Sequence, residues 1–290
     1  MLAMDKIIAP VDFSERSIGA ARYLEALAEH FGSTAILLHV LPPPHYEFSS
    51  MEVGGAVINE LFETRAAQVE EELKQFAVKE LPGLRAERVL LEGDPARQIV
   101  DYAHRERAGL IIVPTHGYGP FRRFILGSVT AKILHDADCP VWTGVHLEEA
   151  PDAGRIGFRT IVAAVDLGEQ SVKVLRWAHA MAESFGARLI LFHAAPPIEN
   201  WEGEYPADKW QGKLAEEAMA RLQRLQGEAG LSAEVMVEAG DAPEAVCSVA
   251  KQAEADLLVI GRGSAAGVFG RLRANAYSII RQSPCPVVSV

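Results

Sequence analysis

Short apolar runs alternate along this chain with longer stretches in which apolar residues recur at helical spacing. In the first half, most runs show no polar alternation, which is typical of strands covered on both faces of a sheet. The runs expected to be strands cover residues 7–11, 35–40, 88–91, 110–113 and 140–143.

Helices are predicted between these runs. Ile18, Ala21, Leu24, Leu27 and Phe31 form one apolar stripe, which predicts a helix, and Gly32 follows as its C′ residue. A second helix is expected over residues 64–78 and a fourth over 128–135. The third begins at Asp94-Pro95, because Asp caps a helix well and Pro at the first position has no amide hydrogen to leave unpaired.

Alternation of strand and helix predicts an α/β fold, with a doubly wound, five-stranded parallel sheet flanked by helices. Ligands bind such sheets outside the carboxyl ends of the strands, where the strand order reverses. Residues that follow the apolar runs are therefore the first candidates for function.

The second half of the chain repeats the first. Residues 6–12 align with 160–166, Gly93-Asp94 with Gly240-Asp241, and Cys139-Pro140-Val141 with Cys285-Pro286-Val287. The order is preserved and the period is the size of a domain, so we expect two tandem domains rather than a solenoid. The predicted boundaries are 1–146 for the first domain, 147–156 for a polar linker and 157–290 for the second domain.

Composition narrows the classes of protein that fit. A content of 49% hydrophobic and 23% charged residues excludes disordered and fibrous chains. The formal net charge of −11 argues against nucleic acid and anionic membranes as partners. No apolar run has the length of a membrane helix and no leader pattern is present, so we expect a cytoplasmic protein. Three widely spaced cysteines indicate neither a disulfide framework nor a metal site.

The segment after the fourth apolar run has the features of a phosphate cradle. Gly117 and Gly119 let the backbone pass close to a ligand because they lack a Cβ. Gly127-Ser128 opens a helix, whose first amides favour an anion, and Thr130 adds a second hydroxyl there. Arg122 and Arg123 could neutralise phosphates or remain solvated.

In this loop the sequence resembles the universal stress protein family, whose ATP-binding members carry Gly-x2-Gly-x9-Gly-Ser/Thr. Gly117, nine residues and Gly127-Ser128 match, whereas Pro114 replaces the first Gly and removes one amide donor. The resemblance implies that the first domain binds ATP, alone or with Mg²⁺, or another adenine nucleotide. The implied contacts are Pro10, Val11 and Asp12 with the nucleoside, Val40 beside the adenine, and Val113, Pro114, His116, Gly117, Gly127, Ser128, Val129 and Thr130 around the phosphates.

The second copy departs further from this pattern. It keeps Gly261, but Ser264 stands at the second Gly, and either Ala274-Asn275 or Arg273-Ala274 stands at Gly-Ser. A side chain there would crowd the phosphate path, so this domain is expected to be non-binding or altered. Its arginines could hold another anion; these are Arg262, Arg271 and Arg273.

Each candidate residue also has a simpler interpretation. Asp12 could be a turn residue before the first helix, and His116 is expected to contact phosphate or lie idle rather than act as a base. His39 and His193 end the second strand in both copies and are expected to be structural. Residues 46–57 are interpreted as a mobile loop or lid.

The function that the resemblance implies is regulation in the stress response, with the two domains paired within one chain or in a homodimer. No catalytic or metal-ligating constellation is found, so at most slow ATP hydrolysis is expected. Two alternatives remain: a scaffold that binds no nucleotide and acts through protein partners, and an ATP-cleaving enzyme.

Overall fold

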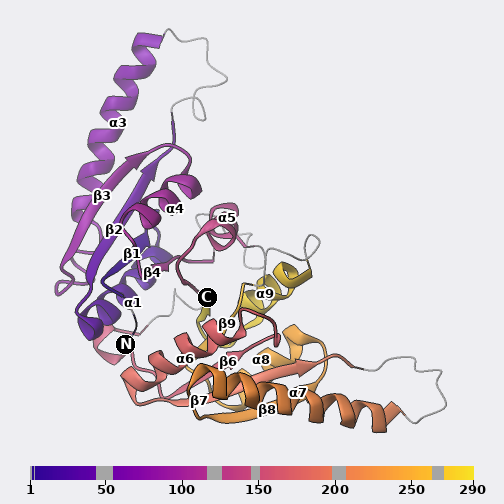
Figure 1. Cartoon of the computed structure of the whole chain (residues 1–290). Coiled ribbons are helices and arrows are strands. Elements are labelled where there is room, and N and C mark those ends of the chain that lie inside the picture. Colours follow the sequence, from indigo (N-terminus) through magenta and orange to yellow (C-terminus); the bar gives the residue numbers. More distant parts are fainter. Residues whose placement is uncertain are drawn as a thin grey trace. The chain divides into compact units, whose positions relative to one another are not determined.

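The computed structural model describes residues 2, 4–43, 55–115, 126–144, 151–197, 207–262 and 271–290. These residues form two compact units, one centred on Ala3–Trp142 and the other on Gly157–Val290 (Figure 1). Each unit contains a parallel sheet flanked by helices, which confirms the predicted α/β class and the tandem duplication. The boundaries at residues 146 and 157 stay predictions.

The strands and helices of the N-terminal unit follow the predicted alternation. In chain order they are β1 (Lys6–Pro10), α1 (Glu15–Phe31), β2 (Thr34–Leu41), α3 (Gly55–Gln75), β3 (Ala86–Glu92), α4 (Pro95–Arg105), β4 (Leu110–Ile112), α5 (Ser128–Asp136) and β5 (Val141–Thr143). The short 3-10 turn η2 (Ala153–Arg155) packs against α1.

The C-terminal unit repeats this order. Its elements are β6 (Thr160–Ala164), α6 (Ser171–Phe185), β7 (Arg188–Ala195), α7 (Ala207–Ala229), β8 (Glu234–Ala239), α8 (Ala242–Gln252), β9 (Leu257–Ile260), α9 (Arg271–Gln282) and β10 (Val287–Ser289). In Figure 1, α3 lies beside β3 in one unit and α7 lies beside β8 in the other.

Strand order places a reversal at the same point of both sheets. The N-terminal unit has the order β3-β2-β1-β4-β5, and the C-terminal unit has β8-β7-β6-β9-β10. Neighbouring strands within each unit run parallel. The chain moves outward from β1 to β3 and then returns to the other side of β1, so the crevice for a ligand is expected between β1 and β4.

Burial follows this topology. Ile7 and Ile8 of β1 and Leu110 and Ile111 of β4 have no exposed surface, because helices cover both faces of the central strands. The outer strand β3 is half-buried along most of its length and exposed at Glu87 and Glu92. The fully buried centre of the sheet therefore lies where the strand order predicts the crevice.

Helix ends are fixed by the residues that the sequence indicated. Asp94 accepts a hydrogen bond from the Arg97 amide and caps α4, and Pro95 is its first residue. Gly32 follows α1 with φ +67°, the left-handed conformation that a C′ glycine adopts most easily. Both predictions are confirmed.

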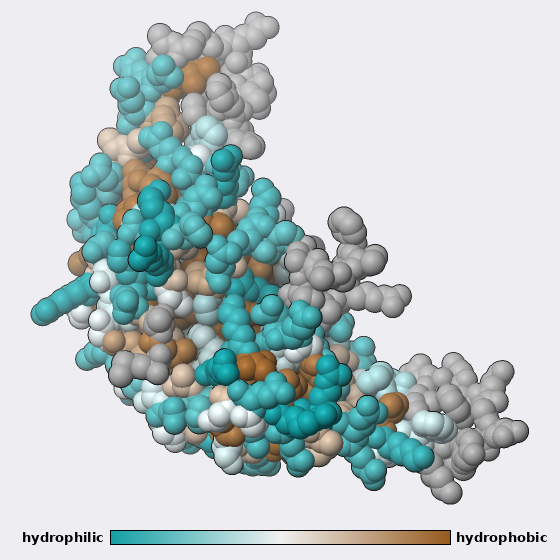
Figure 2. Space-filling model, in the orientation of Figure 1, coloured by the Kyte–Doolittle hydropathy of each residue, from teal (hydrophilic) through white to brown (hydrophobic). Residues whose placement is uncertain are grey.

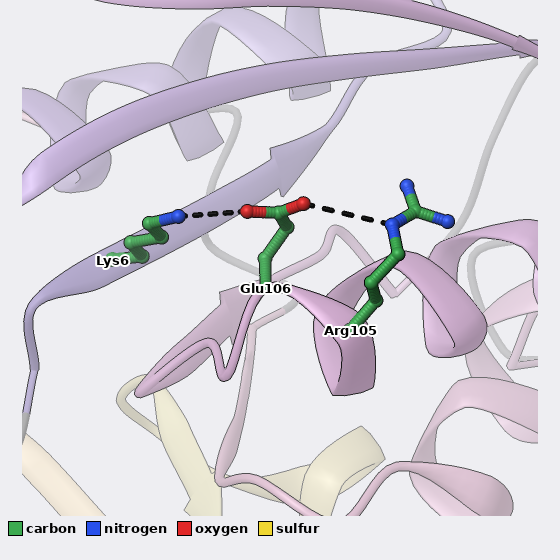
Figure 3. A network of polar contacts seen from close by, with 3 residues as sticks. All are labelled: Lys6, Arg105 and Glu106. Carbon is green, nitrogen blue, oxygen red and sulfur yellow. Dashed lines mark hydrogen bonds and ion pairs between the residues drawn. The ribbon is translucent and has the colours of Figure 1, made fainter.

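An ion-pair network ties the amino end of β1 to the end of α4, at the opposite edge of the sheet from the crevice. Lys6 Nζ lies 2.7 Å from Glu106 Oε2, and Arg105 Nε lies 3.6 Å from Glu106 Oε1 (Figure 3). The hydrogen bond from Lys6 lowers the pKa of the Glu106 carboxyl below its usual value. Its position away from the crevice gives this network a structural role.

Candidate nucleotide site

The turn after β1 brings the first group of expected site residues to the carboxyl edge of the sheet. The Val11 amide donates to the Leu38 carbonyl at 2.9 Å, which extends the pairing of β1 with β2 by one residue. Pro10 and Val11 are buried, whereas Asp12 is partly exposed. Asp12 is thus the first residue of this strand that can meet a ligand.

Hydrogen bonds hold the Asp12 carboxylate in one orientation. Its Oδ1 accepts from the Ser14 amide at 3.1 Å, from Ser14 Oγ at 2.5 Å and from Ser17 Oγ at 2.6 Å. Ser14 caps α1, so the interpretation of Asp12 as a turn residue is confirmed. Because all the described bonds go to Oδ1, Oδ2 can still accept from a ligand hydroxyl. That contact stays a prediction.

His39 joins the ends of the first two strands. Its Nδ1 donates to the Val11 carbonyl at 2.7 Å, and Phe13 stacks on the ring with 4.5 Å between centroids. Burial lowers the pKa of the imidazole, partly opposed by its bond to the carbonyl. His193 makes the equivalent bond to the Val165 carbonyl at 2.8 Å. This shared contact confirms the structural role expected for both histidines.

The end of β4 is tied to the start of α5. The buried hydroxyl of Thr130 donates to the Pro114 carbonyl at 2.9 Å, and the Gly127 amide donates to the Thr115 carbonyl at 2.9 Å. Pro114 lacks an amide, but its carbonyl is a structural acceptor. The Thr130 hydroxyl therefore positions the loop, rather than pointing free toward a phosphate.

The first turn of α5 offers backbone amides at the same edge. Gly127 is the N-cap residue, with φ −60° and ψ 144°, and as a glycine it has no side chain with which to cap the helix. Ser128 is exposed and Val129 is half-buried, so their amides lie near solvent. Such a helix start carries a partial positive charge and favours an anion.

The structure thus brings the expected residues of β1, β4 and α5 to one edge of the sheet. Val40 and Val113 are buried there, each about 5–6% exposed. The expected contacts His116 and Gly117 lie outside the described residues, as do Gly119, Arg122 and Arg123. Among the described residues no group of three or more His, Cys, Asp or Glu side chains could hold a metal ion.

Sequence reasoning missed Ser17, which is fully buried and bonds both the carboxylate and the amide of Asp12. The repeat held the signal, because Ser171 occupies the same position after Asp166 and bonds its Oδ1 at 3.3 Å. Reasoning from the sequence also missed that the C-terminal unit keeps a cavity, of about 150 Å³, at its own strand reversal.

Comparison with known proteins identifies relatives of this fold. The model of the Universal stress protein family matches residues 4–143 and again residues 157–290. Universal stress protein MJ0531 of Methanocaldococcus jannaschii is 30% identical over 136 residues, covering 47% of this chain and 79% of that protein. A universal stress protein of Mycolicibacterium smegmatis is 24% identical over 293 residues, covering 98% of this chain and 96% of that protein.

A solved structure shares this fold over nearly the whole chain. The crystal structure of a universal stress protein from Archaeoglobus fulgidus superposes with a TM-score of 0.66. It has 21% sequence identity and covers 98% of this chain and 95% of that one. Within the described part of the chain, no helix combines the length and the apolar character needed to cross a bilayer.

Proposed function

This chain belongs to the universal stress protein family, and we propose that its N-terminal unit binds ATP or another adenine nucleotide, with a regulatory role in the stress response in the cytoplasm. The observation that carries the proposal is the start of α5. Its N-cap residue, Gly127, has no side chain to cover the first amides, which lie at the edge of the sheet where β1 and β4 separate.

Each part of the nucleotide has a candidate partner among the described residues. The amides at the start of α5 would hold a phosphate group, because a helix N-terminus stabilises negative charge. The fixed Asp12 carboxylate would accept from the ribose hydroxyls through Oδ2, since its described bonds occupy Oδ1. Val40 would pack against the base, and Val113 would lie beside the phosphates. Mg²⁺, if bound with ATP, would supply charge neutralisation at the phosphates.

Calorimetry with ATP and Mg²⁺ on the whole chain tests this proposal. It compares the ATP affinity of the wild-type chain with that of the Gly127→Arg variant. This variant imitates the Arg that stands at the corresponding place in the second copy under one register. The N-cap φ of −60° accepts a side chain without backbone strain, so the variant should fold and obstruct the phosphate path. We expect one ATP per chain and at least a roughly tenfold loss of affinity, which is about 1.4 kcal/mol.

Gly154→Arg is the matched control. It adds the same charge in η2, where an added Cβ meets no atom within 4 Å. It should leave ATP affinity unchanged. If ATP, ADP and AMP produce neither heat nor a thermal shift with the folded wild-type chain, the nucleotide proposal is wrong. A scaffold that acts through protein partners would then be the better account.

A further inference from the structure

A groove on the surface of the C-terminal unit lies between two helices, α6 and α7, which pack against each other. Its volume is about 360 Å³, within the range of roughly 300–1,000 Å³ that small-molecule sites have. Of the described residues that line it, none belongs to β9, α8 or α9, so it is separate from the crevice between β6 and β9. This α6–α7 groove is formed by residues 167–169, 172, 221, 224, 225 and 228.

Two differences between the units leave space for this groove. In the N-terminal unit the ring of Phe13 meets the ring of Phe76, with 5.8 Å between centroids. Leu167 takes the place of Phe13 in the turn after β6, and both residues have a positive φ, of 60° and 64°. Leu225 takes the place of Phe76, three residues after the buried leucine that each of the two helices has. Both leucines lack a ring and both line the groove.

The floor of the α6–α7 groove is apolar. Leu167 is 7% exposed, and Val172 and Leu225 are half-buried. Arg176 of α6 donates from Nη2 to the Glu228 carbonyl of α7 at 2.9 Å, which ties the two helices together beside this floor. An apolar side chain placed on the floor would lose contact with water and gain close packing.

Four charged side chains surround the floor. Arg221, Arg224 and Glu228 recur at helical spacing on one face of α7, and Glu169 lies in the turn before α6. All four are exposed, and neither the guanidinium groups nor the carboxylates bond or pair with another described residue. Arg224 precedes Glu228 by four residues, an order that opposes the helix dipole and gives a weak pair. These charges are therefore available to a ligand.

We propose that the α6–α7 groove binds a small zwitterion, an α-amino acid with an apolar side chain. Arg221 and Arg224 donate to its carboxylate, because guanidinium groups match the geometry of carboxylate oxygens. Glu228, one turn further along the same face, accepts from its ammonium group, and the apolar floor holds its side chain. The two arginines balance Glu169 and Glu228, which suits a ligand without net charge. This inference goes beyond nucleotide binding in the N-terminal unit and does not depend on it.

Calorimetry on the whole chain with L-leucine as the probe tests the proposal. The compound 4-methylpentanoate has the carbon skeleton of leucine without the ammonium group, and 3-methylbutylamine lacks the carboxylate instead. We expect one leucine per chain, and each analogue should bind at least about tenfold more weakly because it loses one set of charged hydrogen bonds. Absence of leucine heat with the folded wild-type chain would overturn the proposal. Binding of either analogue as tight as that of leucine would do the same.

Two substitutions on α7 locate the site. Arg224→Gln removes a guanidinium group and should weaken leucine binding at least about tenfold. Lys213→Gln removes the same charge from α7 outside the groove and should leave leucine affinity unchanged. Glu228→Gln should weaken the binding of leucine but not that of 4-methylpentanoate, a difference that a merely structural role would not produce. Equal leucine affinities for the Arg224 and Lys213 variants would overturn the assignment.

Leu225→Phe restores a ring of the kind that the N-terminal unit has, and it should close the groove and abolish leucine binding. Its circular dichroism spectrum and thermal midpoint show whether it folds, and Arg224→Gln keeps the test decisive if it does not. ATP heat should be unchanged in all four variants, because α5 belongs to the other unit. Failure of ATP binding with intact leucine binding would therefore overturn only the nucleotide proposal, and the reverse result only this one.

Discussion

Thr130 holds together the two segments that frame the candidate nucleotide site. Its buried hydroxyl donates to the carbonyl of Pro114, which follows β4, while its own backbone lies in the first turn of α5. Removing the hydroxyl would leave a buried carbonyl unpaired, at a cost of about 1–3 kcal/mol. The same change would release the loop from the helix start.

Thr130→Val should therefore lower the free energy of unfolding by about 1–3 kcal/mol and also weaken ATP binding. Thr130→Ser keeps the hydroxyl and should restore the affinity, together with most of the stability. Urea unfolding and calorimetry on both variants measure the two effects. Equal affinities for the Val and Ser variants would show that the hydrogen bond does not position the site.

The chemistry of single residues was only partly predictable. The sequence shows that Pro114 has no amide, but not that its carbonyl accepts from Thr130, because that partner lies across a loop. The repeat correctly identified His39 and His193 as structural, since both copies share them. Ser17 was missed although the repeat places Ser171 at the same position, because a Ser shows its role only once its acceptor is known.

Glycines affect the stability of the helices in two opposite ways. A glycine that follows a helix end stabilises the fold, whereas a glycine inside a helix destabilises it. Gly32 and Gly186 end α1 and α6 at φ +67° and +63°, where an L side chain is strained. Gly212 and Gly227 lie inside α7, where an added Cβ meets no atom within 4 Å. A helix-interior glycine costs about 0.5–1 kcal/mol relative to alanine.

Gly32→Ala and Gly186→Ala should each lower the free energy of unfolding by about 1–2 kcal/mol. Gly212→Ala should raise it by about 0.5–1 kcal/mol, because the helix loses less chain entropy on folding. Urea denaturation of the three variants, followed by circular dichroism, compares them directly. Loss of stability in Gly212→Ala would mean that α7 does not keep its helical form there in solution.

At the scale of elements, most central strands and helix starts were predicted to within a few residues, because buried strands and capped helices leave strong patterns. The start of α3 was wrong: the stripe indicated residue 64, whereas the helix begins at Gly55. Val57 and Leu61 in its early turns are 49% and 46% exposed, so no apolar stripe marks this part. The interpretation of residues 46–57 as a loop therefore fails for 55–57, and its remainder lies outside the described residues.

Duplication has given the chain two units with the same strand reversal but with different residues in the loop that follows the fourth strand of each. That the second copy lacks the phosphate path stays a prediction from a few loop residues. The sequence could not predict the cavity at the strand reversal of the second copy, because its volume depends on side chains contributed by β6, β7, β9, α6, α8 and α9 together. A loop motif predicts the binding of one chemical group, such as a phosphate. Whether a cavity is present depends on how the side chains of several elements pack.

Net charge acts on the whole molecule and should slow the approach of an anionic ligand. The chain has a formal charge of −11, and hydrophilic side chains dominate the visible face (Figure 2). ATP is itself an anion, so long-range repulsion opposes its association until it reaches the amides of α5. Salt screens this repulsion over a Debye length of about 30 Å at 0.01 M and about 8 Å at 0.15 M.

Raising the salt concentration across this range should therefore increase the association rate constant of ATP, by about two- to threefold. Stopped-flow measurements with a fluorescent ATP analogue give this rate, and the matching uncharged adenosine analogue is the control, whose rate should not change. An association rate constant for ATP that falls as the salt concentration rises would contradict this prediction. It would show that positive potential at the start of α5 extends beyond the site and outweighs the charge of the rest of the protein, so that the crevice attracts its ligand despite an acidic surface.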